Sequence, residues 1–71
     1  MNIAVYESAR RAGCTRAEAE LLSYYIELSS LKAAAEAAGM SYGSARNNSV
    51  RIKRRLGVDH LSAAIRKVTT Q

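Results

Sequence analysis

The chain has 71 residues, which is enough for one domain but leaves little room for a deep catalytic cleft. Its composition is 48% hydrophobic and 24% charged, which favours a folded domain over a disordered tail. The absence of proline and the presence of only four glycines favour helices, so we expect an all-α fold. The net charge of +5 is unevenly placed, because residues 41–71 carry seven bases and one acid, whereas residues 1–40 carry four bases and five acids. A basic segment of this kind is typical of a protein that binds a polyanion.

The remaining composition excludes several classes of function. Cys14 is the only cysteine and His60 the only histidine, so neither an intrachain disulfide nor a tetrahedral zinc site can form. We find no Ser–His–acid set and no glycine-rich phosphate loop, and we predict no enzymatic activity, no metal and no cofactor. Uncharged runs are too short to span a membrane, and residues 1–7 lack the features of a secretory signal. A reduced, cytoplasmic setting is expected, with Cys14 buried and His60 exposed or capping a helix.

Two helices are predicted in the first half of the chain. The first covers residues 2–12 and ends at Gly13, which suits a left-handed stop. The second begins at a capping box formed by Thr15 and Glu18 and continues to Leu28. Apolar residues at helical spacing, which we expect to face the core, are Ile3, Tyr6 and Ala9 in the first helix and Leu21, Leu22, Tyr25, Ile26 and Leu28 in the second.

Three more helices are predicted in the second half. One covers residues 31–38, is capped by Ser29 or Ser30 and ends at Gly39. The next follows an N-cap at Ser41 and runs to Leu56, with Gly57 as its terminator. The last starts at Asp59, whose side chain can cap towards Ser62, and continues to about Val68. The apolar stripes of these two last helices are Ala45, Ser49, Ile52 and Leu56, and Leu61, Ala64, Ile65 and Val68.

The segment around Gly39 has the pattern of a helix-turn-helix. Such a motif needs a small residue where the two helices meet, a glycine in the turn and an apolar residue that packs back from the second helix. Ala35, Gly39 and Ala45 meet these three needs at spacings of four and six residues. The second helix of this pair is basic and has a serine cap, which strengthens the interpretation.

A longer set of motifs carries a resemblance to a known family. The chain reads Thr15-Arg16-Ala17-Glu18-Ala19-Glu20-Leu21-Leu22, Ser30-Leu31-Lys32, Gly39-Met40-Ser41-Tyr42-Gly43-Ser44-Ala45-Arg46-Asn47 and Ile52-Lys53-Arg54-Arg55-Leu56-Gly57-Val58. In register and without a gap, residues 14–66 resemble the LuxR/GerE-type helix-turn-helix. The resemblance implies a LuxR-like four-helix DNA-binding domain over residues 14–68, preceded by an additional N-terminal helix in an extension over residues 1–13.

The resemblance also implies a set of DNA contacts on the helix 42–56. The family's base contacts match Arg46, Asn47 and Val50, whose side chains suit guanine, adenine and the thymine methyl group respectively. Tyr42 and Gly43, at the start of the helix, are expected nearest to the DNA and complete the five expected base contacts. The expected phosphate contacts are Lys32, Ser41, Ser44, Lys53 and Arg54. For Arg51 and Arg55, on the flanks, solvation and DNA contact remain equally open.

The function implied is that of a bacterial, sequence-specific transcriptional regulator that binds double-stranded DNA in the major groove. We expect it to stand alone, without a receiver or ligand-binding domain before the motif. Two protomers would pair through the last helix as a homodimer and read half-sites about one helical turn apart. The expected dimer interface consists of Leu61, Ala64, Ile65 and Val68.

Two alternatives remain open at this point. An interaction protein that keeps the fold but regulates another transcription factor would tolerate Arg46→Ala and fail with Leu61→Asp or Ile65→Asp. A module similar to region four of a sigma factor would need RNA polymerase as its protein partner. A basic membrane-surface peptide is excluded, because the apolar stripes are spread over several capped helices.

Overall fold

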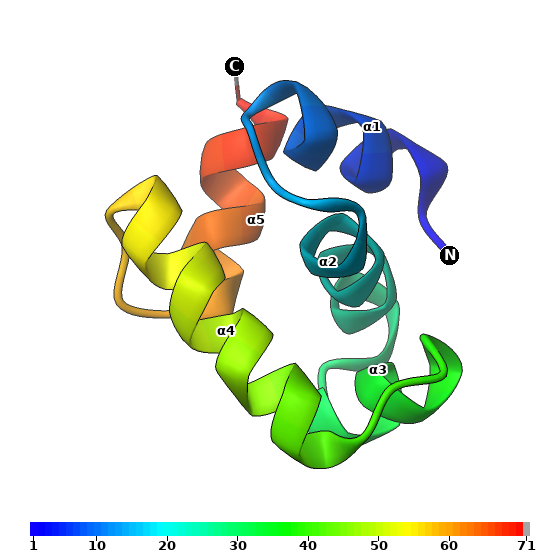
Figure 1. Cartoon of the computed structure of the whole chain (residues 1–71). Coiled ribbons are helices and arrows are strands. Elements are labelled where there is room, and N and C mark those ends of the chain that lie inside the picture. The colour runs from blue at the N-terminus through cyan, green and yellow to red at the C-terminus, as the bar shows by residue number, and fades with distance from the viewer. Residues whose placement is uncertain (71) are drawn as a thin grey trace.

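The computed structural model describes residues 1–70, and within that range it contains five α-helices and no strand (Figure 1). The helices are α1 (Ile3–Arg11), α2 (Arg16–Leu28), α3 (Leu31–Ala37), α4 (Tyr42–Leu56) and α5 (Leu61–Thr69). The all-α prediction is therefore confirmed. Each predicted helix exists, and the largest error is at the start of the last one.

Helix α2 is the centre of the fold, since it contacts each of the other four helices. Figure 1 shows α1 and α3 at opposite ends of the molecule, with α4 crossing beside α2 and α5 packed behind α4. Helix α1 contributes Val5 and Ala9 to the same buried cluster as the other helices. Residues 1–13, expected as an extension, thus share one core with the remainder of the chain.

Side-chain caps explain where four of the helices begin. The Asn2, Thr15, Ser30 and Ser41 side chains each accept a hydrogen bond from the amide three residues later. The capping box predicted at Thr15 is complete, because the Glu18 carboxylate accepts from the Thr15 amide at 2.9 Å.

The start of α5 corrects the sequence prediction. The N-cap is His60, not Asp59, and no side chain donates or accepts a capping hydrogen bond there. Packing decides this boundary, because Leu61 is the first residue of the helix's buried stripe and the chain becomes helical only where that stripe begins.

Glycine sets the two turns that flank α4. Gly39 and Gly57 have φ angles of +71° and +68°, the left-handed region that other residues avoid. The Gly57 amide donates to the Arg54 carbonyl oxygen, which closes the helix. The chain therefore enters and leaves α4 at positions marked in the sequence.

The predicted core stripes are confirmed for α4 and α5 and are partly wrong for α1 and α2. In α1, Ala9 is buried as predicted, but the other buried residue is Val5, while Ile3 is 59% exposed. In α2, Leu21 and Leu22 are buried, whereas Ile26 and Leu28 lie on the surface. Near the C-terminal end of α2, Tyr24 and Tyr25 pack against the core in their place.

Candidate nucleic-acid interface

Helix α4 has one buried face and one free face. The buried residues Ala45, Ser49, Ile52 and Leu56 recur at spacings of four, three and four. The five predicted base-contact residues are all exposed, and at 3.6 residues per turn they lie on one side of the helix. Together with two cations of the same side they define the free face of α4: Tyr42, Gly43, Arg46, Asn47, Val50, Lys53 and Arg54.

The start of α4 combines a serine cap with unpaired backbone donors. The Ser41 hydroxyl oxygen accepts from the Ser44 amide at 3.1 Å, and both serines are exposed. The Ser41 hydroxyl group therefore remains able to donate its proton to a phosphate oxygen. The first amides of a helix have no intrahelical acceptor and carry the positive end of the helix dipole. This end of α4 is therefore suited to an anion.

The other end of the free face carries two cations at the rim of an open hollow of about 380 Å³. Lys53 is half-buried and Arg54 is exposed. The hollow is lined by Val50, Lys53, Arg54, Gly57, Val58 and Asp59. Of the predicted DNA contacts, only Lys32 lies outside α4 and its cap, on α3, where it is exposed. All ten predicted residues are thus accessible to solvent.

One contact within the free face was not predicted from the sequence. The Arg46 guanidinium lies over the Tyr42 ring, 6.0 Å from its centroid. The two residues are four apart on the helix, so their side chains are neighbours on its surface. The arrangement is a cation–π contact at an exposed site.

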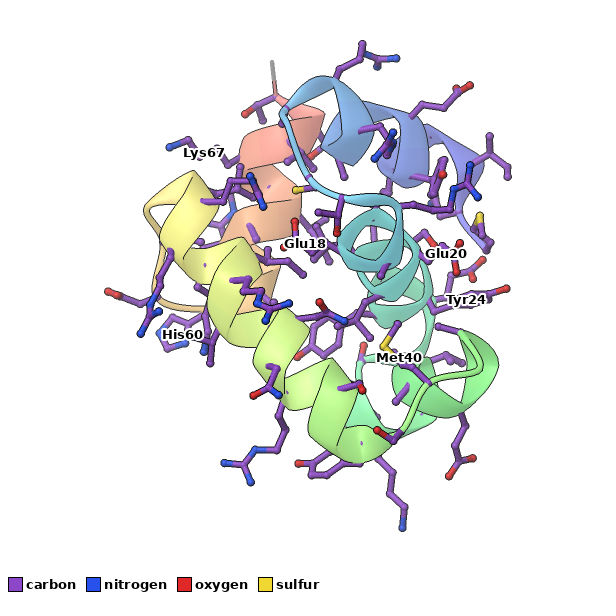
Figure 2. The ribbon with its side chains drawn as sticks, in the orientation of Figure 1. Glu18, Glu20, Tyr24, Met40, His60 and Lys67 are labelled. Carbon is purple, nitrogen blue, oxygen red and sulfur yellow. The ribbon has the colours of Figure 1, made fainter. Side chains whose placement is uncertain are left out.

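Arg55, whose role the sequence left open, is bound to another helix. Its Nε donates to Glu18 Oε1 at 3.1 Å and its Nη2 to Oε2 at 3.4 Å. Figure 2 shows Glu18 on the side of α2 that faces α4, and its side chain is only 1% exposed. The hydrogen bond to this carboxylate raises the pKa of Arg55 above its usual range. Arg55 is therefore an anchor of α4 and not part of its free face.

Two further hydrogen bonds hold α4 against its neighbours. Lys67 Nζ, on α5, donates to the Leu56 carbonyl oxygen at 2.6 Å, at the C-terminal end of α4. Asn48 Nδ2 donates to Met40 Sδ at 3.7 Å, beside the turn that precedes α4. Together with Arg55, these contacts attach the helix to α2, α5 and the 38–41 turn. The free face thus belongs to a helix that is attached by side-chain hydrogen bonds to three other parts of the fold.

The four residues expected at the dimer interface are buried within the chain. Leu61, Ala64, Ile65 and Val68 all lie in the chain's own core, and the most exposed of them, Ile65, is only 9% accessible. They are buried because α5 packs against α1, α2 and α4. The side of α5 that remains open carries Ser62 and Arg66.

A second hollow lies between α2 and α5, away from the free face of α4. It encloses about 180 Å³ and is lined by Tyr25, Ile26, Ser29, Ser62 and Ile65. Ile26 is 39% exposed there. The hollow is small, and its lining contains no charged side chain.

Cys14 and His60 are the remaining residues considered in the sequence. Cys14 is buried, as predicted, and burial raises the pKa of its thiol. His60 is exposed, as predicted, and lies directly before α5 (Figure 2).

Within residues 1–70, no three His, Cys, Asp or Glu side chains gather as metal ligands would. Among the helices of the same range, none combines the length and the apolar character needed to cross a bilayer.

Comparison of the chain with protein-family models, with curated proteins and with solved structures gives no match. The resemblance to the LuxR/GerE-type family stays a prediction. The free face of α4 and the contacts that support it are therefore the observations that bear on function.

Proposed function

We propose that the chain is a sequence-specific DNA-binding protein that inserts α4 into the major groove and regulates transcription. The observation that carries the proposal is the free face of α4, where base-reading side chains and cations are accessible on one side of one anchored helix. A major groove admits a single α-helix, and α3, the 38–41 turn and α4 would act as the helix-turn-helix that presents it.

The side chains at the centre of the free face suit direct readout of base edges. Arg46 can donate two hydrogen bonds to guanine O6 and N7, and Asn47 can pair with adenine N6 and N7. Val50 is 42% exposed, and its methyl groups can contact the thymine methyl group. This combination of residues distinguishes base pairs, whereas a merely basic helix would not.

The residues around this centre suit phosphate binding. Lys53 and Arg54 follow at the C-terminal end of the free face, and the Ser41 cap lies at its start. Lys32 extends the same chemistry onto α3. Helix α4 itself contains no acidic residue, so nothing on it repels the DNA backbone. Phosphate contacts of this kind orient a protein on the duplex without reading sequence.

The homodimer implied by the family resemblance stays a prediction. Its surface would have to differ from the one expected, since the apolar stripe of α5 is used within the chain. The open side of α5 includes Arg66, and a two-fold axis that passes beside this residue would bring like charges together. Symmetry in the bound DNA is the direct way to count protomers.

The proposal is tested by selection of random duplexes with the purified 71-residue protein at near-physiological salt, followed by sequencing. We expect a defined motif, and an inverted repeat would mean two protomers. Arg46→Ala should cost about 1–3 kcal/mol on the preferred duplex and relax the preference at one base pair. Lys53→Ala is the matched control and should weaken all sequences alike. Recovery of no motif would overturn the proposal.

The second candidate, a protein that binds another regulator, is favoured by one feature, the hollow between α2 and α5. The substitutions Leu61→Asp and Ile65→Asp do not test it, since both positions are buried and charges there would unfold the chain. Ile26→Asp changes an exposed residue of the hollow instead. If Ile26→Asp abolishes the regulatory effect of the chain and Arg46→Ala does not, the second candidate is correct.

A further inference from the structure

We infer that Tyr42 is a positioning residue for Arg46, and that the pair, rather than either residue alone, sets the preference for guanine in the bound DNA. The inference rests on the proposed function. It assigns to Tyr42 a role different from the base contact expected from the sequence, because the ring acts through the guanidinium that lies over it.

The surroundings of Arg46 leave the Tyr42 ring as the group that orders it. Within residues 1–70 the ion pairs join Glu27 with the N-terminus and Glu18 with Arg55, and neither involves Arg46. No hydrogen bond of the Arg46 side chain is found in the same range, and α4 has no acidic residue that could compete with DNA for it. The 6.0 Å contact with the ring centroid is the one specific interaction recorded for this guanidinium among the described residues.

The ring contact is compatible with guanine recognition. A guanidinium is planar and its N–H donors point outwards in that plane, so a contact of its central carbon with a ring leaves donors free to bond guanine O6 and N7. A long arginine side chain loses rotamer freedom on binding, and a ring that restricts it beforehand reduces that loss. Tyr42 is 51% exposed and is the first residue of α4, so replacing its ring leaves the buried core unchanged.

The same geometry explains why an aromatic residue at this position matters more than its hydroxyl group. The attraction comes from the face of the ring, which phenylalanine also offers and leucine does not. Tyr42→Phe therefore tests the hydroxyl, and Tyr42→Leu tests the ring with similar apolar bulk. Tyr42→Met serves as a second ring-free variant, and thermal melting of each variant checks that α4 still folds.

The experiment repeats the random-duplex selection with the wild type, Tyr42→Phe, Tyr42→Leu and Arg46→Ala, and then measures affinities on the best duplex. The same duplex with 7-deazaguanine at the position read by Arg46 removes the N7 acceptor alone. We expect Tyr42→Leu to weaken binding by about two- to five-fold, the strength of an exposed cation–π contact, and to flatten the preference for guanine. Tyr42→Phe should match the wild type.

The double variant decides between positioning and direct contact. If Tyr42 acts through Arg46, Tyr42→Leu has no further effect in the Arg46→Ala background, and a smaller effect on the 7-deazaguanine duplex, where Arg46 keeps only the O6 acceptor. An equal loss with and without Arg46 would overturn the inference, because Tyr42 would then contact the DNA itself. Equal losses in Tyr42→Phe and Tyr42→Leu would overturn it in favour of a hydroxyl contact. A wild-type selection that yields no motif would refute the proposed function, and the inference with it, before any variant is compared.

Discussion

The side of α4 that faces α2 and the free face of α4 differ in what their arginines do. Arg55 and Arg54, one on each, are adjacent in the sequence. Arg55 turns towards α2 and is bound to the buried Glu18 carboxylate. Arg54, one residue earlier, lies exposed beside Lys53 at the rim of the open hollow. Helical phase relative to α2 therefore decides which arginine supports the fold and which is available to a ligand. Charge counted along the sequence therefore overstates the number of cations that are free to bind a ligand.

The largest expected effect comes from removing the carboxylate that anchors α4 to α2. Glu18→Ala removes a carboxylate that completes the α2 capping box and accepts from Arg55. We expect the free energy of unfolding to fall by about 2–4 kcal/mol, because a cap, a buried hydrogen bond and buried volume are lost together. Chemical denaturation measures this. Glu20→Ala is the control, since Glu20 points away from α4 (Figure 2) and should change stability little.

The two neighbouring arginines give the sharpest form of the comparison. Arg54→Ala should leave the melting temperature unchanged, weaken DNA binding and make the slope of log affinity against log salt shallower by about 1. Arg55→Ala should lower the melting temperature, because it leaves the buried Glu18 carboxylate without its partner. Melting curves and salt titrations of both variants are the measurements. Identical behaviour of the two variants would mean that Arg54 and Arg55 do not have different roles.

Gly43 offers a test in which stability and binding change in opposite directions. A Cβ atom added there would meet only the Ser41 hydroxyl, at 4.0 Å, so the fold leaves room for it. Gly43→Ala should stabilise the protein by about 0.5–1 kcal/mol, because alanine has the higher helix propensity. It should also lower DNA affinity, because the free face of α4 would carry an extra methyl group at its point of closest approach. Unchanged affinity would mean that Gly43 does not face the DNA.

The smallest effect concerns Cys14, which lies just before α2 and close to the pair of Glu18 and Arg55. Burial raises the pKa of its thiol above the usual value of 9.0, so the folded chain keeps the proton at a pH where the unfolded chain loses it. Stability from this group is complete below the unfolded pKa and is lost as the pH rises towards the folded one. Denaturation at increasing alkaline pH should show this decline in the wild type, while Cys14→Ala lacks it.

The sequence predicts the parts of this fold that are determined locally. The Ser41 cap, the Thr15–Glu18 capping box and the stops at Gly39 and Gly57 each depend on a few neighbouring residues. The accessible residues of α4 follow from one helical period once its buried stripe is recognised. These two kinds of signal were enough to predict all five helices and the exposure of the candidate DNA contacts.

The misses have a common cause, because they depend on how helices meet. Arg55 and Glu18 are 37 residues apart, and neither position shows in the sequence that α2 and α4 face each other there. The stripe on α5 correctly indicates burial, yet periodicity does not say whether a partner chain or the same chain covers it. At the start of α5 the choice between Asp59 and His60 follows from the packing of Leu61, which no capping rule contains.

The most direct test of the central claim is an NMR titration of the ¹⁵N-labelled protein with the duplex recovered by selection. If the free face of α4 enters the major groove, the largest amide shift changes fall within residues 41–54. In that case Ile26 and Ser62, at the hollow between α2 and α5, change little. Shifts concentrated at that hollow, with α4 unaffected, would contradict the account.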